Sequence, residues 1–172
     1  MNTQAICAIA TPPGSSALGI IRISGKNLKN LTKQIFSKNL EDRKAILVSI
    51  IDHKNLLDNC VSIFYESPKS YTGEDMIEII CHGNQVIMNS ILSLLNKKGI
   101  RIARPGEFTE RAFFNDKVDL IQAEAISDLI SASDSRAVKA AHNSLSGKFA
   151  DEIKTICDKI LATRAEVESI IN

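Results

Sequence analysis

Short apolar runs and alternating apolar and polar positions occupy most of the first two thirds of the chain. Runs of this length, bounded by Gly, Pro, Asn, Asp or Ser, are typical of β-strands. The pattern predicts strands at residues 3–10, 17–24, 45–51, 60–65 and 75–81, and a short strand at 100–103. A polar segment, residues 52–59, is expected to connect the third and fourth of these strands.

Three segments between and after the strands have helical spacing instead. They are residues 26–37, 85–97 and 108–114. Lys97 and Lys98 followed by Gly99 are stop signals for the second of them, because cations and a glycine favour a helix C-terminus. Residues 1–118 are therefore predicted to form an α+β domain with a mixed sheet.

After Val118 the pattern is helical only. Asp119 followed by Gln122 resembles a capping box, which predicts a helix start at this point. A second helix is expected to begin near Ser133 or Asp134, with an interruption at Gly147. Residues 119–172 are thus predicted to be the first helices of an all-α domain.

The last predicted helix carries an apolar seam whose members are spaced as in a coiled coil. The seam consists of Phe149, Ile153, Ile156, Ile160, Val167 and Ile170. One side of this helix needs a partner, which the earlier helices could supply. The alternative is that the chain is a fragment, and its end at Asn172 directly after two isoleucines favours that alternative.

Composition excludes several function classes. The chain has 172 residues, 44% of them hydrophobic, so it can bury a core and global disorder is not expected. A formal charge of +1, few aromatics and no Trp disfavour a dedicated nucleic-acid binder. The N-terminus does not resemble a signal peptide, and no apolar run approaches the ~18 residues of a membrane span. We therefore expect a cytoplasmic protein with no membrane association.

The glycines around Ser15 and Ser16 are spaced as in a phosphate-binding P-loop. A P-loop requires Lys and then Ser or Thr after its last glycine, but Ile20 and Ile21 follow Gly19. The segment after Gly14 also has a strand pattern, so no helix N-terminus is available to hold phosphate. The stretch is interpreted as a tight connection between two strands.

Two charges stand inside otherwise apolar predicted strands. Arg22 shares a face with Leu18 and Ile20, and Glu78 lies in the apolar segment Met76 to Cys81. Both faces of each strand have apolar neighbours, which predicts strands covered on both sides. An unpaired buried charge costs several kcal/mol or more, so each charge must have a partner. The two could form a structural ion pair, or they could line a ligand pocket, and the sequence favours neither.

The remaining candidate functional residues have simpler structural explanations. Lys117 is most simply a solvated loop lysine, and residues 71–75 could be either a binding loop or a plain turn before a strand. The four cysteines form no CxxC pair and are interpreted as small buried residues. Cys81 and His82 point to opposite faces of a strand, which disfavours a metal site. No catalytic residue and no metal ligand is predicted.

Taken together, several long motifs resemble one family. They are "ATPPG" with "IIRISG", "SYTGEDMIEIICHG", "RIARPGEFTERAFFNDKVDLIQAEAISDLI" and a following "LSG". From about Ile6 to its end the chain resembles the N-terminal part of the tRNA-modifying GTPases called MnmE or TrmE. Where the family often has more Gly and Arg after "PPG", this chain has Ser15-Ser16-Ala17.

The resemblance implies a fold and a set of partners. Family members have an α+β domain related to tetrahydrofolate-binding domains of one-carbon enzymes, which forms a homodimer. A helical domain follows, with a Ras-like G domain inserted into it. With the flavoprotein MnmG (GidA), these proteins add an aminomethyl-type (carboxymethylaminomethyl) group to the wobble uridine of certain tRNAs.

The resemblance also implies a cofactor site. The family binds 5-formyl-tetrahydrofolate or a related reduced folate near the dimer interface, and its contacts fall here on Arg22, Glu78 and Lys117. GTP, magnesium and potassium would be bound only by the G domain, whose P-loop motif is missing from these residues. We therefore expect no GTPase activity from this chain alone. A stand-alone folate-dependent aminomethyltransferase and a pure dimerisation module remain the alternatives.

Overall fold

The chain divides into two compact units, Met1–Lys117 and Val118–Asn172. The computed structural model describes residues 4–36 and 38–171. Within these ranges, the side chains of residues 148–151 and 169–171 are not described.

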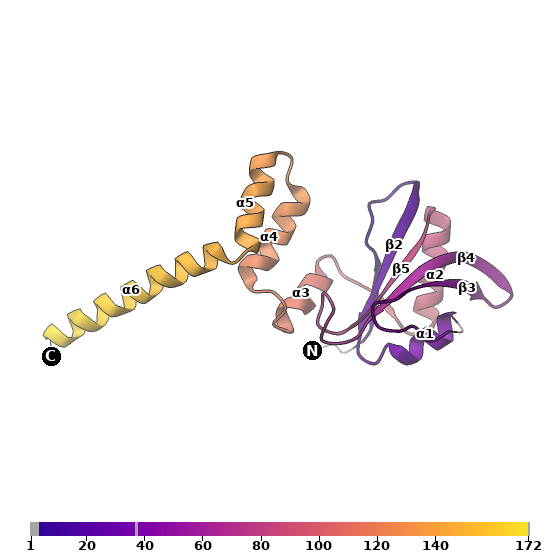
Figure 1. Cartoon of the computed structure of the whole chain (residues 1–172), viewed down its shortest axis with the longest axis horizontal. Helices are drawn as coiled ribbons and strands as arrows, with labels where there is room; N and C mark the ends of the chain where they lie inside the picture. The colour runs from indigo at the N-terminus through magenta and orange to yellow at the C-terminus, as the bar shows by residue number, and fades with distance from the viewer. Residues whose placement is uncertain (1–3, 37, 172) are drawn as a thin grey trace. The chain divides into compact units, whose positions relative to one another are not determined.

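The first unit is built on a six-stranded mixed sheet in the order β3-β4-β5-β2-β1-β6 (Figure 1). Its strands are β1 Ile6–Ile9, β2 Ser16–Gly25, β3 Ala45–Asp52, β4 Asn55–Tyr65, β5 Asp75–Gly83 and β6 Arg101–Ile102. All neighbouring pairs are antiparallel except β1 and β6, which are parallel. The predicted α+β class with a mixed sheet is confirmed.

Three helices belong to this unit: α1 Lys29–Phe36, α2 Gln85–Lys97 and α3 Glu107–Phe114. The bounds of α2 agree with the prediction because its ends carry strong local signals. The side chain of Asn84 accepts hydrogen bonds from the backbone N–H groups of Val86 and Ile87, which caps the helix start. Gly99 follows the helix end with φ 85°, a conformation that suits glycine.

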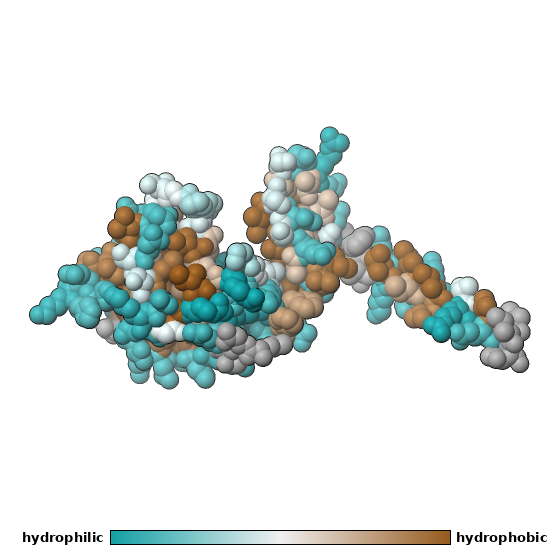
Figure 2. All heavy atoms as spheres, turned by 180° about the vertical axis from the view of Figure 1, so that it is seen from behind, coloured by the Kyte–Doolittle hydropathy of each residue, from teal (hydrophilic) through white to brown (hydrophobic). Residues whose placement is uncertain are grey.

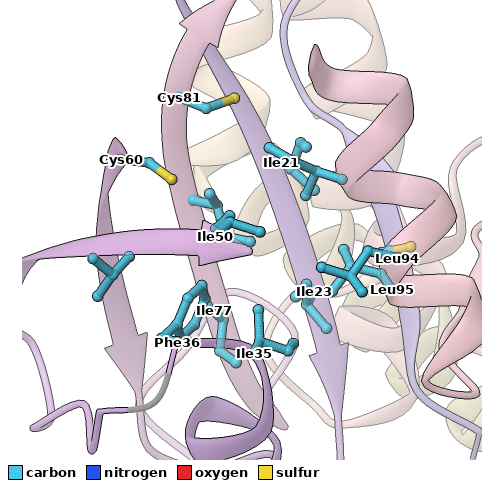
Figure 3. Packing of buried hydrophobic residues seen from close by; sticks show 14 of the residues in the cluster. Ile21, Ile23, Ile35, Phe36, Ile50, Cys60, Ile77, Cys81, Leu94 and Leu95 are labelled. Carbon is cyan, nitrogen blue, oxygen red and sulfur yellow. The ribbon is translucent and has the colours of Figure 1, made fainter. Parts of the chain in front are cut away.

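The core lies between one face of the sheet and the helices α1 and α2. Figure 3 shows Ile21 and Ile23 of β2 beside Leu94 and Leu95 of α2. On the α1 side the cluster also contains Ile35, Phe36, Val48, Ile50, Phe64 and Ile77. These side chains are almost fully buried, and their removal from water provides the main stabilisation of the unit.

The other face of the sheet is only partly covered. Leu18 is 61% exposed and Leu47 is 66% exposed, while Ile20 and Arg22 are half-buried. The expectation that β2 is covered on both sides is therefore wrong. The helices α1 and α2 both contribute to the core on the side of Ile21 and Ile23, which leaves Leu18 on the opposite side of β2 exposed and Ile20 and Arg22 only half-buried.

The hairpin of β3 and β4 is longer than predicted. The segment 52–59 was expected to be a polar connection, but β4 begins at Asn55 and only His53 and Lys54 form the turn. Polar residues are accommodated in the strand because they find partners there. Buried Asp58 accepts hydrogen bonds from the backbone N–H groups of Asn59 and His82, both at 2.8 Å.

Three of the four cysteines are buried, as predicted, and all four are free. Burial raises the pKa of Cys7 to about 11, and burial with the nearby charge of Asp58 raises that of Cys60 to about 12. Cys157 is exposed on the last helix, so the prediction is wrong for this residue. The buried thiols therefore remain protonated and poorly reactive near neutral pH.

The second unit consists of α4 Leu120–Ser131, α5 Ser135–Leu145 and α6 Lys148–Ile171. The predicted capping box is present, since Asp119 and Gln122 exchange side-chain to backbone hydrogen bonds. Gly147 has φ 78° and separates α5 from α6, which confirms the predicted interruption. No helix among the described residues is long and apolar enough to span a membrane.

The predicted seam of α6 is largely open in this chain. Ile153, Ile156, Ile160 and Val167 are 40–62% exposed, and Figure 2 shows apolar atoms along this helix. The other two members, Phe149 and Ile170, lie outside the residues whose side chains are described.

Candidate functional site

Arg22 and Glu78 meet across neighbouring strands. The register of β2 and β5 places these two residues directly opposite each other, so that they share one face of the sheet. Arg22 Nε lies 2.7 Å from Glu78 Oε1, and the Glu78 side chain is only 15% exposed. The ion pair that the sequence allowed is therefore formed.

The second carboxylate oxygen of Glu78 is also engaged. The hydroxyl of Tyr65, at the end of β4, donates to Glu78 Oε2 at 3.0 Å. Burial together with this hydrogen bond raises the pKa of Tyr65, which therefore stays protonated as a donor at neutral pH. A carboxylate offers about four acceptor positions, so Glu78 can accept further hydrogen bonds.

The pair lies in an open hollow with a volume of about 570 Å³. The hollow is lined by Arg22, Arg43, Tyr65, Lys69, Ser70, Tyr71, Met76, Glu78 and Lys117. Met76 is buried, and Tyr65 and Glu78 are half-buried, so these residues form its floor. All three site residues that the resemblance implies line this one hollow. Arg22 and Glu78 can therefore form an ion pair and line a pocket at the same time.

A loop between β4 and β5 forms one wall of the hollow. The ring of Tyr71 lies under the Arg22 guanidinium, with 5.7 Å between the guanidinium carbon and the ring centroid. The hydroxyl of Tyr71 is hydrogen-bonded to that of Thr109, which fixes the ring. Of residues 71–75, Tyr71 lines the hollow.

Gly73 in this loop explains how Lys117 reaches the hollow. Gly73 has φ 76°, and a Cβ built on it would lie 3.0 Å from Asn115 Cβ and 3.1 Å from Lys117 Cγ. The missing side chain lets the stem of Lys117 pack against the loop. Lys117 Nζ then donates to the carbonyl oxygen of Pro68 at 3.1 Å.

The hollow is strongly positive. Four side-chain cations and one carboxylate line it, which gives a formal charge of +3. Clustered charge of one sign attracts counter-ions and favours ligands of the opposite sign. The lining therefore suits an anionic ligand that also has hydrogen-bond donors for Glu78.

A buried charge network, which the sequence analysis did not foresee, supports the base of the loop. Arg111 donates to Glu74 Oε2 at 2.8 Å and to the Gln4 carbonyl oxygen at 2.8 Å, and it lies 3.4 Å from Glu107. Glu107 in turn accepts two hydrogen bonds from Arg101. The spacing of Glu107 and Arg111 by four residues in a helix was the available signal.

Several lining residues were also missed. They are Arg43, Tyr65, Lys69 and Met76, and no local pattern in the sequence groups them. The pairing of β4 with β5 places Tyr65 opposite Met76, and the hydrogen bond from the Arg43 backbone N–H to the Phe64 carbonyl oxygen brings Arg43 beside this pair. Among the residues that the structure describes, no group of three His, Cys, Asp or Glu side chains could hold a metal ion.

Both parts of the chain are similar to known proteins. A sequence model described as "GTP-binding protein TrmE N-terminus" matches residues 5–117, and one described as "MnmE helical domain" matches residues 120–172. The chain is 44% identical over 167 residues to proteins named "tRNA modification GTPase MnmE" from Francisella philomiragia subsp. philomiragia and Francisella tularensis subsp. holarctica. The matches cover 97% of this chain and 37% of each relative.

The chain thus spans little more than a third of the length of these relatives. The two matched segments correspond to the two kinds of architecture described above, a mixed sheet with helices and an all-helical part. On these matches, the chain belongs to the MnmE/TrmE family, of which it carries the N-terminal domain and helical-domain sequence.

Proposed function

We propose that residues 5–117 bind a reduced folate, such as 5-formyl-tetrahydrofolate, in the hollow around Arg22 and Glu78. The observation that supports this proposal is the placement of a half-buried carboxylate at the floor of a cation-lined hollow. Its volume of about 570 Å³ is within the range of roughly 300–1,000 Å³ typical of small-molecule sites.

The lining fits the chemistry of a folate. A pterin ring presents N–H donors side by side, and the free acceptor positions of Glu78 can receive two of them in one plane. The ring would have an apolar surface in Met76 and aromatic surfaces in Tyr65 and Tyr71. The glutamate portion of a folate is anionic, and Arg22 and Lys117 would oppose it.

The same proposal places this chain in a tRNA-modifying GTPase. The relatives are named tRNA modification GTPases, and these 172 residues contain no P-loop motif for GTP. GTP hydrolysis, with its magnesium and potassium, would therefore reside elsewhere in the full-length protein. That protein, with the flavoprotein MnmG, would add an aminomethyl-type group to the tRNA wobble uridine, and the bound folate would supply the one-carbon unit.

Calorimetric titration with 5-formyl-tetrahydrofolate tests the binding step. We expect saturable binding at a single site in each chain. The control ligand is p-aminobenzoylglutamate, which has the anionic tail but no pterin, and it should bind far more weakly. Equal binding of the two ligands would mean that the hollow is only an anion site, and absence of binding would contradict the proposal.

We further propose that the open sheet face forms a homodimer. Leu47, Val61, Ile80 and Ile20 lie opposite one another on successive strands and make an apolar row on this face. Two-fold association would cover the row by placing the same surface on both copies. The Arg22–Glu78 pair is on the same face, so the hollow would adjoin the dimer contact.

Sedimentation of two variants over a concentration series distinguishes this face from the open seam of α6. Leu47→Lys should weaken self-association by roughly tenfold or more, because it places a charge in the apolar contact. Ile160→Lys, which makes the same change in α6, should have little effect. The reverse result would show that the seam drives association, and a parent chain that stays monomeric would contradict the dimer.

A further inference from the structure

Three exposed cations surround the mouth of the hollow at one place. Arg43, Lys69 and Lys117 are exposed, whereas the floor residues are buried or half-buried. Arg43 Nη2 donates to the carbonyl oxygen of Lys69 at 2.6 Å, and Lys117 Nζ donates to that of Pro68 at 3.1 Å. Arg43 and Lys117 thus both bind the Pro68–Lys69 backbone, and together with Lys69 they are called the rim cations below.

The rim cations are poorly neutralised. In the described part of the chain, neither Lys69 nor Lys117 has a carboxylate within ion-pair distance. The nearest acidic group to Arg43 is Asp42, whose Oδ2 lies 3.9 Å from Arg43 Nε. Like charges repel, so gathering three of them here opposes folding unless a ligand supplies negative charge.

The number of cations exceeds what one folate needs. A folate with a single glutamate has two carboxylates, and Arg22 at the floor already offers one cation near the ligand. Arg22 and Lys117 can oppose these two carboxylates, and Arg43 and Lys69 add two further, exposed cations.

From this arrangement we infer that the site selects folates with a poly-γ-glutamate tail. The rim cations would bind the carboxylates of this tail. The inference rests on the proposed folate site and adds to it the form of the ligand. Each further glutamate brings one more carboxylate, and the flexible stems of lysine and arginine can follow a chain that has no fixed conformation. The contacts would be exposed, so each would be weak and sensitive to salt.

The inference is tested with two ligands, the mono- and the pentaglutamate of 5-formyl-tetrahydrofolate, titrated against the full chain at low salt. We expect the pentaglutamate to bind roughly three- to thirtyfold more tightly, which corresponds to a few exposed ionic contacts. Lys69→Ala should reduce this ratio several-fold. Raising the salt concentration should reduce the ratio further.

Lys54→Ala is the matched control. Lys54 is exposed in the turn between β3 and β4, at the opposite end of β4 from Tyr65, and it carries the same charge. This variant should keep the parent ratio. Among the described residues, Lys69 is hydrogen-bonded through its backbone alone, and its side chain is exposed, so Lys69→Ala should also keep the parent melting temperature.

The possible outcomes distinguish the proposed folate site from the inferred preference for a polyglutamate tail. Monoglutamate binding with no gain from the longer tail, or a gain that Lys69→Ala does not alter, would overturn the inference and leave the folate site intact. If Lys69→Ala preserves the ratio but weakens tRNA binding by the full-length protein, the rim contacts phosphates instead. A parent chain that binds neither folate would contradict the proposed function and this inference with it.

Discussion

Replacing Arg111 by Met is expected to destabilise the first unit by about 3–5 kcal/mol. Arg111 is 9% exposed and its guanidinium joins Glu74, Glu107 and the carbonyl oxygen of Gln4. Met keeps much of the side-chain volume but leaves Glu74 as a half-buried carboxylate without its cation. Urea denaturation followed by circular dichroism measures the change in the free energy of unfolding.

Arg104→Met is the matched control for this prediction. Arg104 forms ion pairs with Glu107 and Glu110, but its side chain is 66% exposed, so water screens both contacts. We expect a loss below about 1 kcal/mol. Similar losses for the two variants would show that the buried network does not stabilise the unit more than ordinary surface pairs do.

The network also predicts how stability depends on pH. The hydrogen bonds from Arg101 outweigh burial and lower the pKa of Glu107 from 4.5 to about 2. Because the pKa in the folded state is below that in the unfolded state, the stabilisation is fully present above about pH 4.5 and is lost as the pH falls towards 2. Glu107→Gln should be less stable at pH 7 and should lose less stability on acidification than the parent chain. An unchanged acid dependence in this variant would mean that Glu107 is not the responsible group.

Glu78→Gln is expected to weaken the binding of 5-formyl-tetrahydrofolate by roughly ten- to a hundredfold. The substitution keeps the side-chain shape but turns one acceptor oxygen into a donor, which would oppose a pterin N–H. Tyr65 and Arg22 both donate to this carboxylate, so one of them would also face a donor. Calorimetry and thermal unfolding should be measured on the same preparation.

The folate affinity and the melting temperature of this variant together show whether the Arg22–Glu78 pair is part of a ligand site or only a structural ion pair. A folded variant with weakened folate binding supports a ligand site. A purely structural pair predicts instead a clear loss of stability and no folate binding even by the parent chain. Glu124→Gln in α4, an exposed position outside the hollow, makes the same chemical change and should leave folate binding unaltered.

Several features could be predicted from the sequence because their causes are local. The bounds of α2, the capping box before α4 and the break at Gly147 depend on hydrogen bonds and backbone angles within a few residues. The strands before Val118 and the purely helical pattern after it follow from side-chain periodicity, which can be seen directly in the sequence. Arg22 and Glu78 stood out for a related reason, since a charge inside an apolar strand requires a partner wherever the strand lies.

Other features depend on pairing between residues far apart in the sequence, and only the tertiary structure determined them. The register of β2 with β5 made Arg22 and Glu78 partners, and the register of β4 with β5 added Tyr65 and Met76 to the same hollow. Because α1 and α2 pack on the side of Ile21 and Ile23, Leu18 on the other face of β2 is exposed, where the sequence had predicted cover on both sides of this strand. The rim cations converge because two separate backbone carbonyls bind Arg43 and Lys117. These contacts join residues 26 and 49 positions apart, a separation at which side-chain periodicity along the chain carries no information.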